Sequence, residues 1–168
     1  MRSIYFYDTI FGTCWIADNG ELGDAGQIQN FYFAKPSDLK KYQLCETDII
    51  RKAGIQLQEY STGTRKVFDL PFDLKGTEFE KNVWQALLTI PYGELRSYKD
   101  IAIQVGSPKA CRAVGRANGL NPIALFIPCH RVVGADKSLT GFAFGIELKK
   151  KLLEHENIIF DHKNRVIG

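Results

Sequence analysis

A cysteine followed directly by a histidine, Cys129-His130, is the pair of residues best suited to covalent chemistry in this sequence. A thiol near neutral pH is mostly protonated, and a nearby base or imidazolium raises the fraction of nucleophilic thiolate. Neighbouring side chains on an extended strand point to opposite faces, so a contact between the two requires a bridging water or a bend at Pro128. By itself the pair does not distinguish a nucleophile from a buried structural cysteine, the commoner use of this residue.

Basic residues gather in the same part of the chain. Residues 1–75 carry 9 Lys and Arg against 10 Asp and Glu, whereas residues 76–168 carry 13 against 9, so the two parts have balances of −1 and +4. Six of the basic residues lie within 96–131, where Asp100 alone opposes them. A local excess of this kind indicates a polyanionic partner such as DNA, or simply a solvated basic face. Those six residues are Arg96, Lys99, Lys109, Arg112, Arg116 and Arg131.

Two short helices joined by a turn are expected to carry this basic segment. Ser97 with Asp100 three residues later predicts a capped helix over residues 98–105. Gly106-Ser107 is typical of a tight turn, and Pro108 suits the first position of a further helix that runs to about Ala117. The pattern is that of a helix-turn-helix. The second helix is rich in small residues, which permit close approach to a narrow minor groove or simply pack against another helix; they are Ala110, Cys111, Ala113, Gly115 and Ala117.

The remaining elements divide the chain into two regions that we take as domains, 1–75 and 76–168. In the first, strands are expected over 4–7, 11–17, 27–33 and 66–70, a hairpin-type turn at Asn19-Gly20 and a helix over 48–60. In the second, Thr77 and Glu80 form a capping box for a helix that runs to Leu88. A short strand over 123–127 should lead into Pro128-Cys129, and a final helix should cover 145–156. The first domain carries no recognisable chemistry and is expected to act as a scaffold.

Composition excludes several classes of protein. A hydrophobic content of 45% with 12% aromatic residues is typical of a globular chain. No apolar run approaches the roughly 20 residues of a membrane span, and the N-terminus lacks a secretory leader, so we expect a cytoplasmic protein with no membrane partner. The four cysteines lie far apart with no CxxC pair, which disfavours a disulfide framework and a zinc site. Ligands that converge only in space stay open, and we expect no metal and no cofactor.

Four motifs that follow one another along the chain favour a functional role for Cys129 over a structural one. The segment 93–156 contains SYKDIA, SPKACRAVGRANGLNP, PCHRV and LLEHE. In these motifs it resembles the C-terminal domain of the methylated-DNA–protein-cysteine methyltransferases, also called O6-alkylguanine-DNA alkyltransferases. The resemblance implies an α+β fold, with a small antiparallel sheet and a helix of ribonuclease-H-like kind in the first domain. It implies a mainly helical, winged-helix-like second domain with the helix-turn-helix.

The resemblance also implies the roles of individual residues. Cys129 would accept the alkyl group, His130 would activate it through a bridging water, and Glu156 would orient His130. Asn121 would brace the turn between the DNA-binding helix and the active site. Tyr98 would crowd the target phosphate and donate a proton to the departing guanine. Arg131 would support the active-site loop by pairing elsewhere in the protein.

DNA and the damaged base would be bound by a second group of residues. The lesion lies within a duplex, so the base must be extruded, and the resemblance gives Arg112 the task of filling the gap. Ala110, Cys111, Ala113 and Gly115 would line the minor-groove face. The carbonyls of Cys129 and Val132 and the amide of Ala143 would read the extruded base. Phe142 and Phe144 stand where the family often has tyrosine and commonly has glycine, which predicts a preference for methyl over benzyl lesions.

The resemblance implies DNA repair by a protein that acts once, because an S-alkyl thioether has no easy hydrolytic exit. The partner is double-stranded DNA with O6-alkylguanine; O4-methylthymine is a further lesion that the sequence leaves open. Nothing in the sequence demands a protein partner or more than a monomer. Two other classes stay in view. A catalytically silent lesion binder would replace the acceptor cysteine, and a cysteine hydrolase or unrelated regulator would show turnover or no lesion preference.

Overall fold

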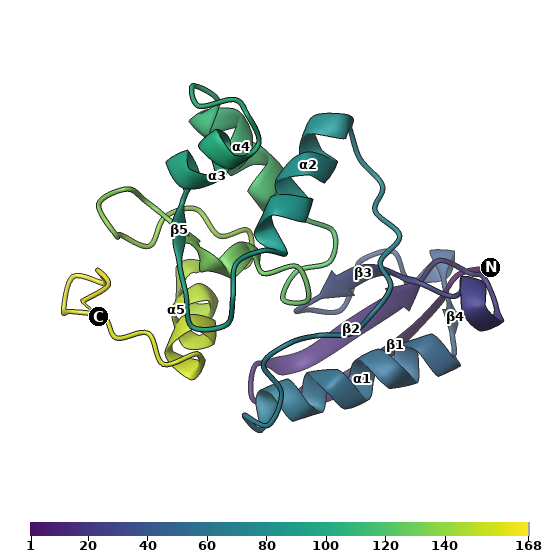
Figure 1. Cartoon of the computed structure of the whole chain (residues 1–168). Coiled ribbons are helices and arrows are strands. Elements are labelled where there is room, and N and C mark those ends of the chain that lie inside the picture. The colour runs from purple at the N-terminus through teal and green to yellow at the C-terminus, as the bar shows by residue number, and fades with distance from the viewer. Residues whose placement is uncertain (168) are drawn as a thin grey trace. The chain divides into compact units, whose positions relative to one another are not determined.

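The chain forms two compact units in the computed structural model, which describes residues 1–167. Unit 1 comprises Met1–Lys75 together with Pro122–Phe126, and unit 2 comprises Gly76–Asn121 and the chain from Ile127 onward. The elements of both are drawn in Figure 1, where the sheet and α1 belong to unit 1. Mixed strands and five α-helices give the α+β class that the sequence predicts. The ribonuclease-H-like and winged-helix-like details stay predictions.

Unit 1 is built on a four-stranded sheet in the order β3-β2-β1-β4. The strands are β1 (Ser3–Thr9), β2 (Gly12–Asp18), β3 (Ile28–Tyr32) and β4 (Gln43–Leu44). Three of the predicted strands are thus confirmed within a few residues. The expectation of a purely antiparallel sheet is wrong, because β4 pairs with β1 in parallel. Two residues are too few to show a strand period in the sequence, so β4 could not be predicted.

The predicted turn at Asn19-Gly20 lies between two antiparallel neighbours, β2 and β3, but it is not a tight two-residue hairpin turn. The tight hairpin joins β1 to β2, where Thr9 pairs with Gly12 and Gly12 has a φ of 96°. Asn19 instead opens a longer connection to β3 that contains the short 3-10 helix Gly23–Ala25 and closes through a 2.9 Å hydrogen bond from Asn19 N to Gln27 O. The left-handed conformation of Gly20 begins this loop without pairing two strands directly.

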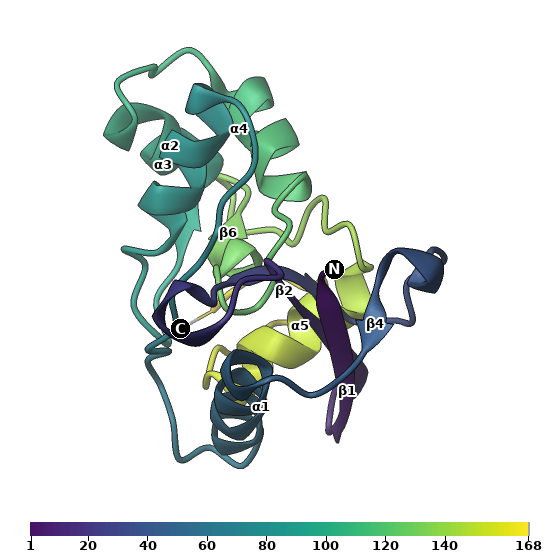
Figure 2. The same ribbon diagram turned by 90° about the vertical axis from the view of Figure 1, so that its right-hand side faces the viewer.

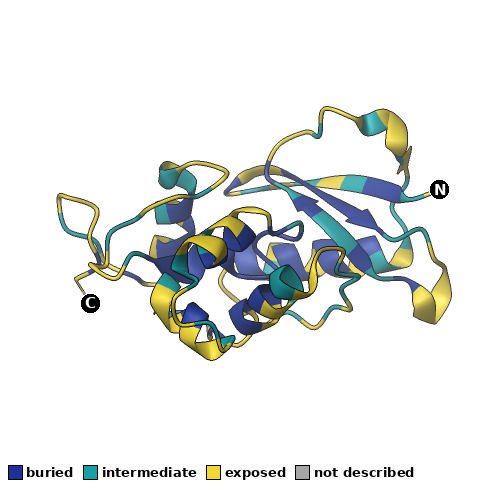
Figure 3. Ribbon diagram, turned by 90° about the horizontal axis from the view of Figure 1, so that it is seen from above, coloured by how far each residue is buried: buried dark blue, intermediate teal, exposed yellow. Residues whose placement is uncertain are grey.

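Helix α1 (Asp48–Ser61) confirms the helix predicted over 48–60 and covers the sheet of unit 1. Several of its apolar residues, among them Ile50, Leu57 and Tyr60, are buried, whereas Ile55 is exposed. Figure 3 colours the chain by burial, with the buried residues in dark blue. A Cβ atom on Gly54 would lie 2.3 Å from the ring of Tyr7, so only glycine permits this close contact of helix and strand. The views in Figures 1 and 2 show α1 lying along the strands.

The strand expected over 66–70 does not form. The backbone there is irregular, and its polar groups pair with a side chain instead of a neighbouring strand. The amide of Gln56 donates to Asp69 O at 3.0 Å and accepts from Asp69 N at 2.9 Å. Such a side-chain amide supplies the two hydrogen bonds that a sheet neighbour would otherwise provide. The residues of this segment that favour β-strands therefore did not predict its structure.

Unit 2 begins with three packed helices, α2 (Glu78–Leu87), α3 (Tyr98–Gln104) and α4 (Cys111–Gly119). Both predicted capping boxes are confirmed: Thr77 with Glu80 opens α2, and Ser97 with Asp100 opens α3. Trp84 of α2 is buried and donates from its indole nitrogen to Ala117 O at 2.9 Å, which fixes α2 against α4. The helix predicted over 145–156 is confirmed as α5 (Ile146–His155).

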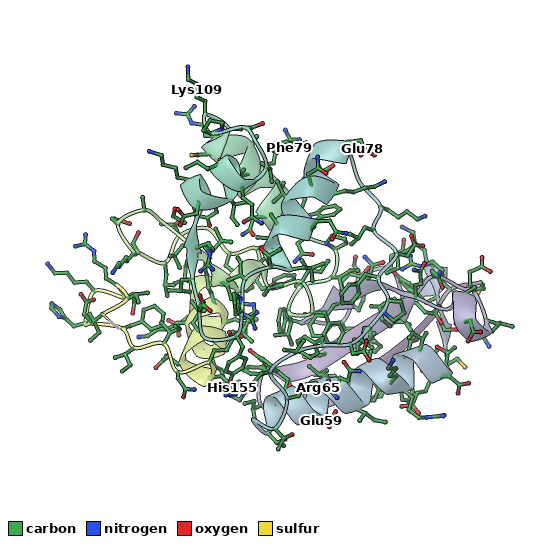
Figure 4. The ribbon with its side chains drawn as sticks, in the orientation of Figure 1. Glu59, Arg65, Glu78, Phe79, Lys109 and His155 are labelled. Atoms are coloured by element: carbon green, nitrogen blue, oxygen red, sulfur yellow. The ribbon has the colours of Figure 1, made fainter. Side chains whose placement is uncertain are left out.

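Helix α4 begins later than the sequence predicts. Pro108 is not its first residue, because residues 107–110 form a turn closed by a 2.9 Å bond from Ala110 N to Ser107 O. Ala110 precedes the helix with φ −96° and ψ 32°. The turn between α3 and α4 is consequently longer than expected. Figure 4 shows Lys109 at this turn, with its side chain pointing away from the helices.

The strand expected over 123–127 is also absent. Ile123 makes an isolated bridge to Phe31, and Phe31 N donates to Pro122 O at 2.9 Å, which attaches this short segment to the sheet of unit 1. Leu125 then takes a left-handed φ of 70°, a conformation that breaks any extended run. The apolar residues are buried as the sequence suggests, but they form a buried loop.

A short parallel pair joins two distant parts of unit 2. Strand β5 (Arg96–Ser97) pairs with β6 (Val132–Val133), so the residues just before α3 lie beside those just after Cys129. Neither strand has more than two residues, and the sequence gives no signal for either. This pairing is what brings the start of α3, with Tyr98, to the neighbourhood of the Cys129 segment.

Candidate active site

Cys129 lies in a short 3-10 helix, Cys129–Arg131, and not on a strand. The backbone turns at Pro128, with hydrogen bonds from Cys129 N to Ile127 O at 2.7 Å and from Arg131 N to Pro128 O at 3.0 Å. Adjacent side chains here are therefore not forced to opposite faces. The bend that a functional Cys-His pair requires is present. Cys129 itself is only 3% exposed, so its thiol sits in a protected environment.

His130 is completely buried and held by a carboxylate from the end of α5. Its Nε2 lies 2.6 Å from Glu156 Oε2, and neither side chain has any exposed surface. The other ring nitrogen, Nδ1, is buried with no hydrogen-bond partner among residues 1–167. Because the carboxylate accepts a hydrogen bond, it favours the tautomer with the proton on Nε2 and a lone pair on Nδ1. Nδ1 is therefore the nitrogen able to accept a proton.

The protonation states of the pair follow from burial and partners. Burial lowers the pKa of His130, against the opposing influence of Glu156, so the imidazole is neutral near pH 7. Burial by itself would raise the pKa of Glu156, but the hydrogen bonds from His130 and Arg131 and the charge of Arg131 lower it well below its usual range. A neutral imidazole beside an ionised carboxylate is the state in which histidine acts as a general base.

Arg131 supplies the charge that makes the buried carboxylate tolerable. Its Nε and Nη2 lie 2.8 and 3.2 Å from the two oxygens of Glu156, and its Nη1 donates to Ile90 O at 2.7 Å. Gly93 N donates to Glu156 Oε1 at 3.2 Å. Glu156 follows the last residue of α5 and so projects from a helix end into this set of donors. A buried ion pair is stable only when its remaining polar atoms are satisfied, as they are here.

Two asparagines tie the end of α4 to the cysteine segment. Asn121 donates from Nδ2 to Ile127 O at 2.8 Å, the contact expected of a residue that braces this turn. Asn118 donates from Nδ2 to Cys129 O at 3.3 Å, and its own oxygen is buried without a partner among the described residues. The sequence did not single out Asn118 as a site residue. The available signal was its position in α4, three residues before Asn121, which follows the helix.

Tyr98 and Lys149 meet at one carbonyl oxygen beside the cysteine. Tyr98 Oη donates to Thr140 O at 3.0 Å, and Lys149 Nζ lies 3.1 Å from the same oxygen and 2.5 Å from Val132 O. The side chain of Lys149 is fully buried, and burial lowers its pKa to about 8. Burial also raises the pKa of Tyr98. Both groups lie close enough to interact with the charge of a Cys129 thiolate.

The sequence did not single out Lys149, because it stands in the run Lys149-Lys150-Lys151, which has the composition of an exposed helix face. The predicted pocket residues lie near it in the chain. Phe142 and Phe144 form an edge-on ring pair with centroids 5.5 Å apart, and Phe144 is 37% exposed. Ala143, between them, is exposed. Two backbone carbonyls expected to read a base already accept one protein hydrogen bond each, from Asn118 at Cys129 and from Lys149 at Val132.

The residues of α4 fall on two faces. Arg112, Ala113 and Arg116 are exposed, whereas Ala117 is buried against Trp84. Ala110, Cys111 and Gly115 are half-buried, and a Cβ on Gly115 would lie 3.8 Å from the ring of Tyr98. The packing alternative is confirmed for Ala117, and the minor-groove alternative stays a prediction. Some of them permit packing, and Ala113 leaves an exposed small-residue surface between two arginines.

Known proteins match this chain over the region that carries the site. A family model described as the DNA binding domain of 6-O-methylguanine DNA methyltransferase matches residues 78–158. The constitutive methylated-DNA–protein-cysteine methyltransferase of Bacillus subtilis is 55% identical over 119 residues, which is 70% of this chain and 72% of that protein. The chain belongs to the methylated-DNA–protein-cysteine methyltransferase family. It is therefore an enzyme of the methyltransferase class whose residues 78–158 correspond to a DNA-binding domain.

A further relative and two solved structures also match this chain. The methylated-DNA–protein-cysteine methyltransferase of Methanosarcina barkeri is 54% identical over 106 residues, 63% of this chain and 67% of that protein. The crystal structure of Mycobacterium tuberculosis O6-methylguanine methyltransferase is 41% identical with a TM-score of 0.83 and covers 93% of each chain. That of Mycobacterium tuberculosis OGT in complex with DNA is 42% identical with a TM-score of 0.82 and covers 92% of each. The structural match thus includes both units.

Neither a metal-binding cluster nor a membrane-spanning helix is found among residues 1–167. No group of three His, Cys, Asp or Glu side chains in this part of the chain is placed to hold a metal ion. Among the same residues, none of the helices has the length and apolar character needed to cross a bilayer.

Proposed function

We propose that this methyltransferase repairs double-stranded DNA by moving a methyl or other alkyl group from O6 of guanine to Cys129 Sγ, once per molecule. The observation that carries the proposal is the buried set of Cys129, neutral His130 and ionised Glu156, with His130 Nδ1 left as the proton acceptor. A thiol next to such a base is a nucleophile in a site closed to bulk water.

The proposed reaction balances within these residues and the lesion. The thiol proton passes through a water to His130 Nδ1, and the thiolate attacks the alkyl carbon. The new S–C bond forms as the C–O6 bond breaks, and the bonding electron pair stays with guanine. Tyr98 then donates its phenolic proton to the guanine anion. Burial keeps that phenol protonated until it is needed, because it raises the pKa of Tyr98.

The ammonium of Lys149 is the proposed electrostatic partner of these steps. It lies on the carbonyls of Val132 and Thr140, near enough to Cys129 for its charge to favour the thiolate. A fixed positive charge in a buried site also stabilises negative charge as it develops on the leaving base. The product is a thioether, which water does not readily cleave, so the protein is expected to act a single time.

DNA is proposed to bind through α3 and α4 as a helix-turn-helix, with α4 in the minor groove. The exposed Ala113 between Arg112 and Arg116 supports this, because a small residue permits close approach while the arginines pair with phosphates or enter the stack. Extruding the damaged base is expected to cost a few kcal/mol. We assign to Arg112 the role of filling the gap, and to Val132, Ala143, Phe142 and Phe144 the walls of the base pocket.

The range of lesions is proposed to favour small alkyl groups. Phe144 stands at the rim with its ring against that of Phe142, so a bulky O6 substituent has to displace an aromatic pair. O4-methylthymine is a second substrate to be tested beside O6-methylguanine. A cytoplasmic location, a monomeric state and independence from protein partners stay predictions.

The test is to incubate the protein with duplex DNA containing O6-methylguanine and to weigh the intact protein. We expect one addition of about 14 Da, the mass of a methylene, mapped to the Cys129 peptide. Cys129→Ser should abolish the addition, whereas Cys45→Ser, which removes a half-buried thiol of unit 1, should retain it. Binding to the lesion without a mass gain would identify a silent lesion binder instead. Continued release of repaired DNA from one protein molecule would identify a true catalyst.

A further inference from the structure

Thr140 lies at the end of a loop that is contacted by a distant part of the chain. Residues 134–140, which we call the pocket loop, follow β6 and close on themselves through a 3.0 Å bond from Gly134 N to Ser138 O. Lys137, at the tip of the loop, has a left-handed φ of 66°. Thr140, at the end of this loop, supplies the carbonyl that accepts from both Tyr98 Oη and Lys149 Nζ. Any displacement of the loop therefore moves the acceptor of the Tyr98 phenol.

A cavity of about 440 Å³ lies behind the pocket loop. Its lining includes Gly134, Ala135 and Lys137 of the loop, Arg96 and Ser97 of β5, and Val166 near the C-terminus. A loop that borders a cavity lacks the close side-chain packing that fixes most buried segments. Hydrogen bonds then contribute more to its position: those at Thr140 from Tyr98 and Lys149, and those with the C-terminal segment at its other edge.

The C-terminal segment supplies those bonds. Residues 160–166, which we call the tail hairpin, are paired through a bridge between Phe160 and Val166. Asp161 accepts hydrogen bonds from the backbone of Lys163 at 2.8 Å and of Arg165 at 3.0 Å, which closes the hairpin turn. On its inner side Val166 is buried with Val133, Leu153 and Ile158 in one apolar cluster.

An antiparallel bridge between Ser138 and Arg165 joins the tail hairpin to the pocket loop. The hydrogen bond from Val166 N to Lys137 O, 3.1 Å long, belongs to this bridge. The charge of Arg165 also helps to lower the pKa of Asp136 in the loop, after the larger effect of the hydrogen bonds of Ser138. The tail hairpin therefore lies beside the pocket loop and holds it through backbone hydrogen bonding.

We propose that the tail hairpin is a positioning element for Tyr98: it fixes the pocket loop, whose Thr140 carbonyl in turn orients the Tyr98 hydroxyl. The inference rests on the proposed function, in which that hydroxyl protonates the departing guanine. Catalytic groups must be held closely for proton transfer, and a shift of about 1 Å caused far from the chemistry can slow a reaction 100-fold. Residues of the tail would thus tune alkyl transfer without touching the substrate.

The experiment compares two proline substitutions in the tail hairpin. Val166→Pro removes the N–H that donates to Lys137 O in the loop, whereas His162→Pro places a proline at the hairpin turn and keeps the hydrogen bonds from Arg165, Val166 and Ile167. Single-turnover methyl transfer should slow on the order of tenfold in Val166→Pro and stay within about twofold of wild type in His162→Pro. Alkylation of Cys129 by iodoacetamide, measured on its peptide, needs no acid and should be unchanged in both.

A double-mutant cycle with Tyr98→Phe separates positioning from general loss of stability. If the tail acts through the phenol, Val166→Pro should have little further effect once the hydroxyl is gone. The inference would be overturned if the effects of Val166→Pro and Tyr98→Phe multiplied, or if Val166→Pro and His162→Pro transferred at equal rates, while methyl transfer by the wild type still upheld the proposed function. A wild type that transfers no methyl group would instead contradict the proposed function.

A milder pair of variants covers the case in which Val166→Pro does not fold. Asp161→Ala removes the acceptor that closes the tail hairpin, and Asp161→Asn keeps an oxygen at the same place. We expect slower transfer in Asp161→Ala, with rescue by Asp161→Asn and no change in iodoacetamide reactivity. Equal transfer rates in wild type and Asp161→Ala, with the hairpin shown to be loosened by faster amide exchange at Arg165, would contradict the positioning role.

Discussion

Replacing Glu156 by glutamine tests the buried network at its centre. The carboxylate accepts hydrogen bonds from His130 Nε2 at 2.6 Å, from two nitrogens of Arg131 at 2.8 and 3.2 Å, and from Gly93 N at 3.2 Å. Glutamine has nearly the same size as glutamate, so it fills the same buried space. It offers one acceptor oxygen, however, and turns an NH2 group toward donors. Arg131, which is 6% exposed, then keeps a buried charge with no counter-charge in this network.

The expected loss of stability follows from that unpaired charge. Removing one partner of a buried ion pair costs about 3–5 kcal/mol. For a chain of this size each kcal/mol lowers the melting temperature by roughly 2–4 °C, so Glu156→Gln should melt on the order of 10 °C below wild type. The methyl-transfer rate should fall as well, by about 100-fold or more, because His130 loses the partner that fixes its tautomer and orientation.

The pKa of Glu156 determines how its contribution to stability changes with pH. The pKa of Glu156 in the folded protein lies below that of an unfolded glutamate, about 4.3. Its contribution to stability is therefore complete above that value and is lost as the pH falls from there through the folded pKa. The difference in unfolding free energy between wild type and Glu156→Gln should be constant from neutral pH to about pH 5 and shrink in more acidic solution.

Urea denaturation across this pH range, with single-turnover transfer at pH 7.5, measures both effects. Glu154→Gln is the matched control, because Glu154 is exposed on the same helix and should change stability by less than about 0.5 kcal/mol. The reasoning would be refuted by a Glu156→Gln protein within about 1 kcal/mol of wild type that transfers methyl groups at the wild-type rate.

Three further perturbations address the pocket, the DNA surface and the buried lysine. Phe144→Gly should raise the rate of benzyl relative to methyl transfer by removing the rim ring, and an unchanged ratio in competition assays would count against the pocket assignment. Arg112→Ala should slow repair of duplex DNA on the order of tenfold, about 1.4 kcal/mol, and leave reaction with the free alkylated base unchanged; equal losses on both substrates would exclude a role in extruding the base. Lys149→Met should flatten stability above pH 8. The pKa of Lys149 is about 8 in the folded protein and about 10.4 in the unfolded chain. Between pH 8 and about pH 10.4 the unfolded wild-type chain therefore binds more protons than the folded protein. The free energy of unfolding of the wild type, measured in urea, should rise with pH in that range.

Local signals in the sequence predicted the elements that depend on local chemistry. The pairs Thr77 with Glu80 and Ser97 with Asp100 open helices where expected, because a capping box satisfies backbone donors within one turn. The resemblance placed His130 and Glu156 together, and the structure puts them in contact. It also left the partners of Arg131 unnamed, and these depend on tertiary packing.

Features set by distant contacts could not be predicted. The two-residue strands β5 and β6 exist only because they pair with each other, and the left-handed Leu125 turns an apolar run into a loop. Lys149 stands among lysines yet is fully buried, because two carbonyls and a nearby thiol compensate for its lost hydration. None of these has a period or a local partner that the sequence could display.

A count of methyl groups removed per protein molecule tests the central claim most directly. Duplex DNA with radiolabelled O6-methylguanine is added in increasing excess, and label on the protein and in the DNA is counted at completion. The account predicts a plateau at one methyl group per chain, all of it in the Cys129 peptide and none in Cys129→Ser. Loss of label from DNA that continues past one equivalent, or label on a residue other than Cys129, would contradict it.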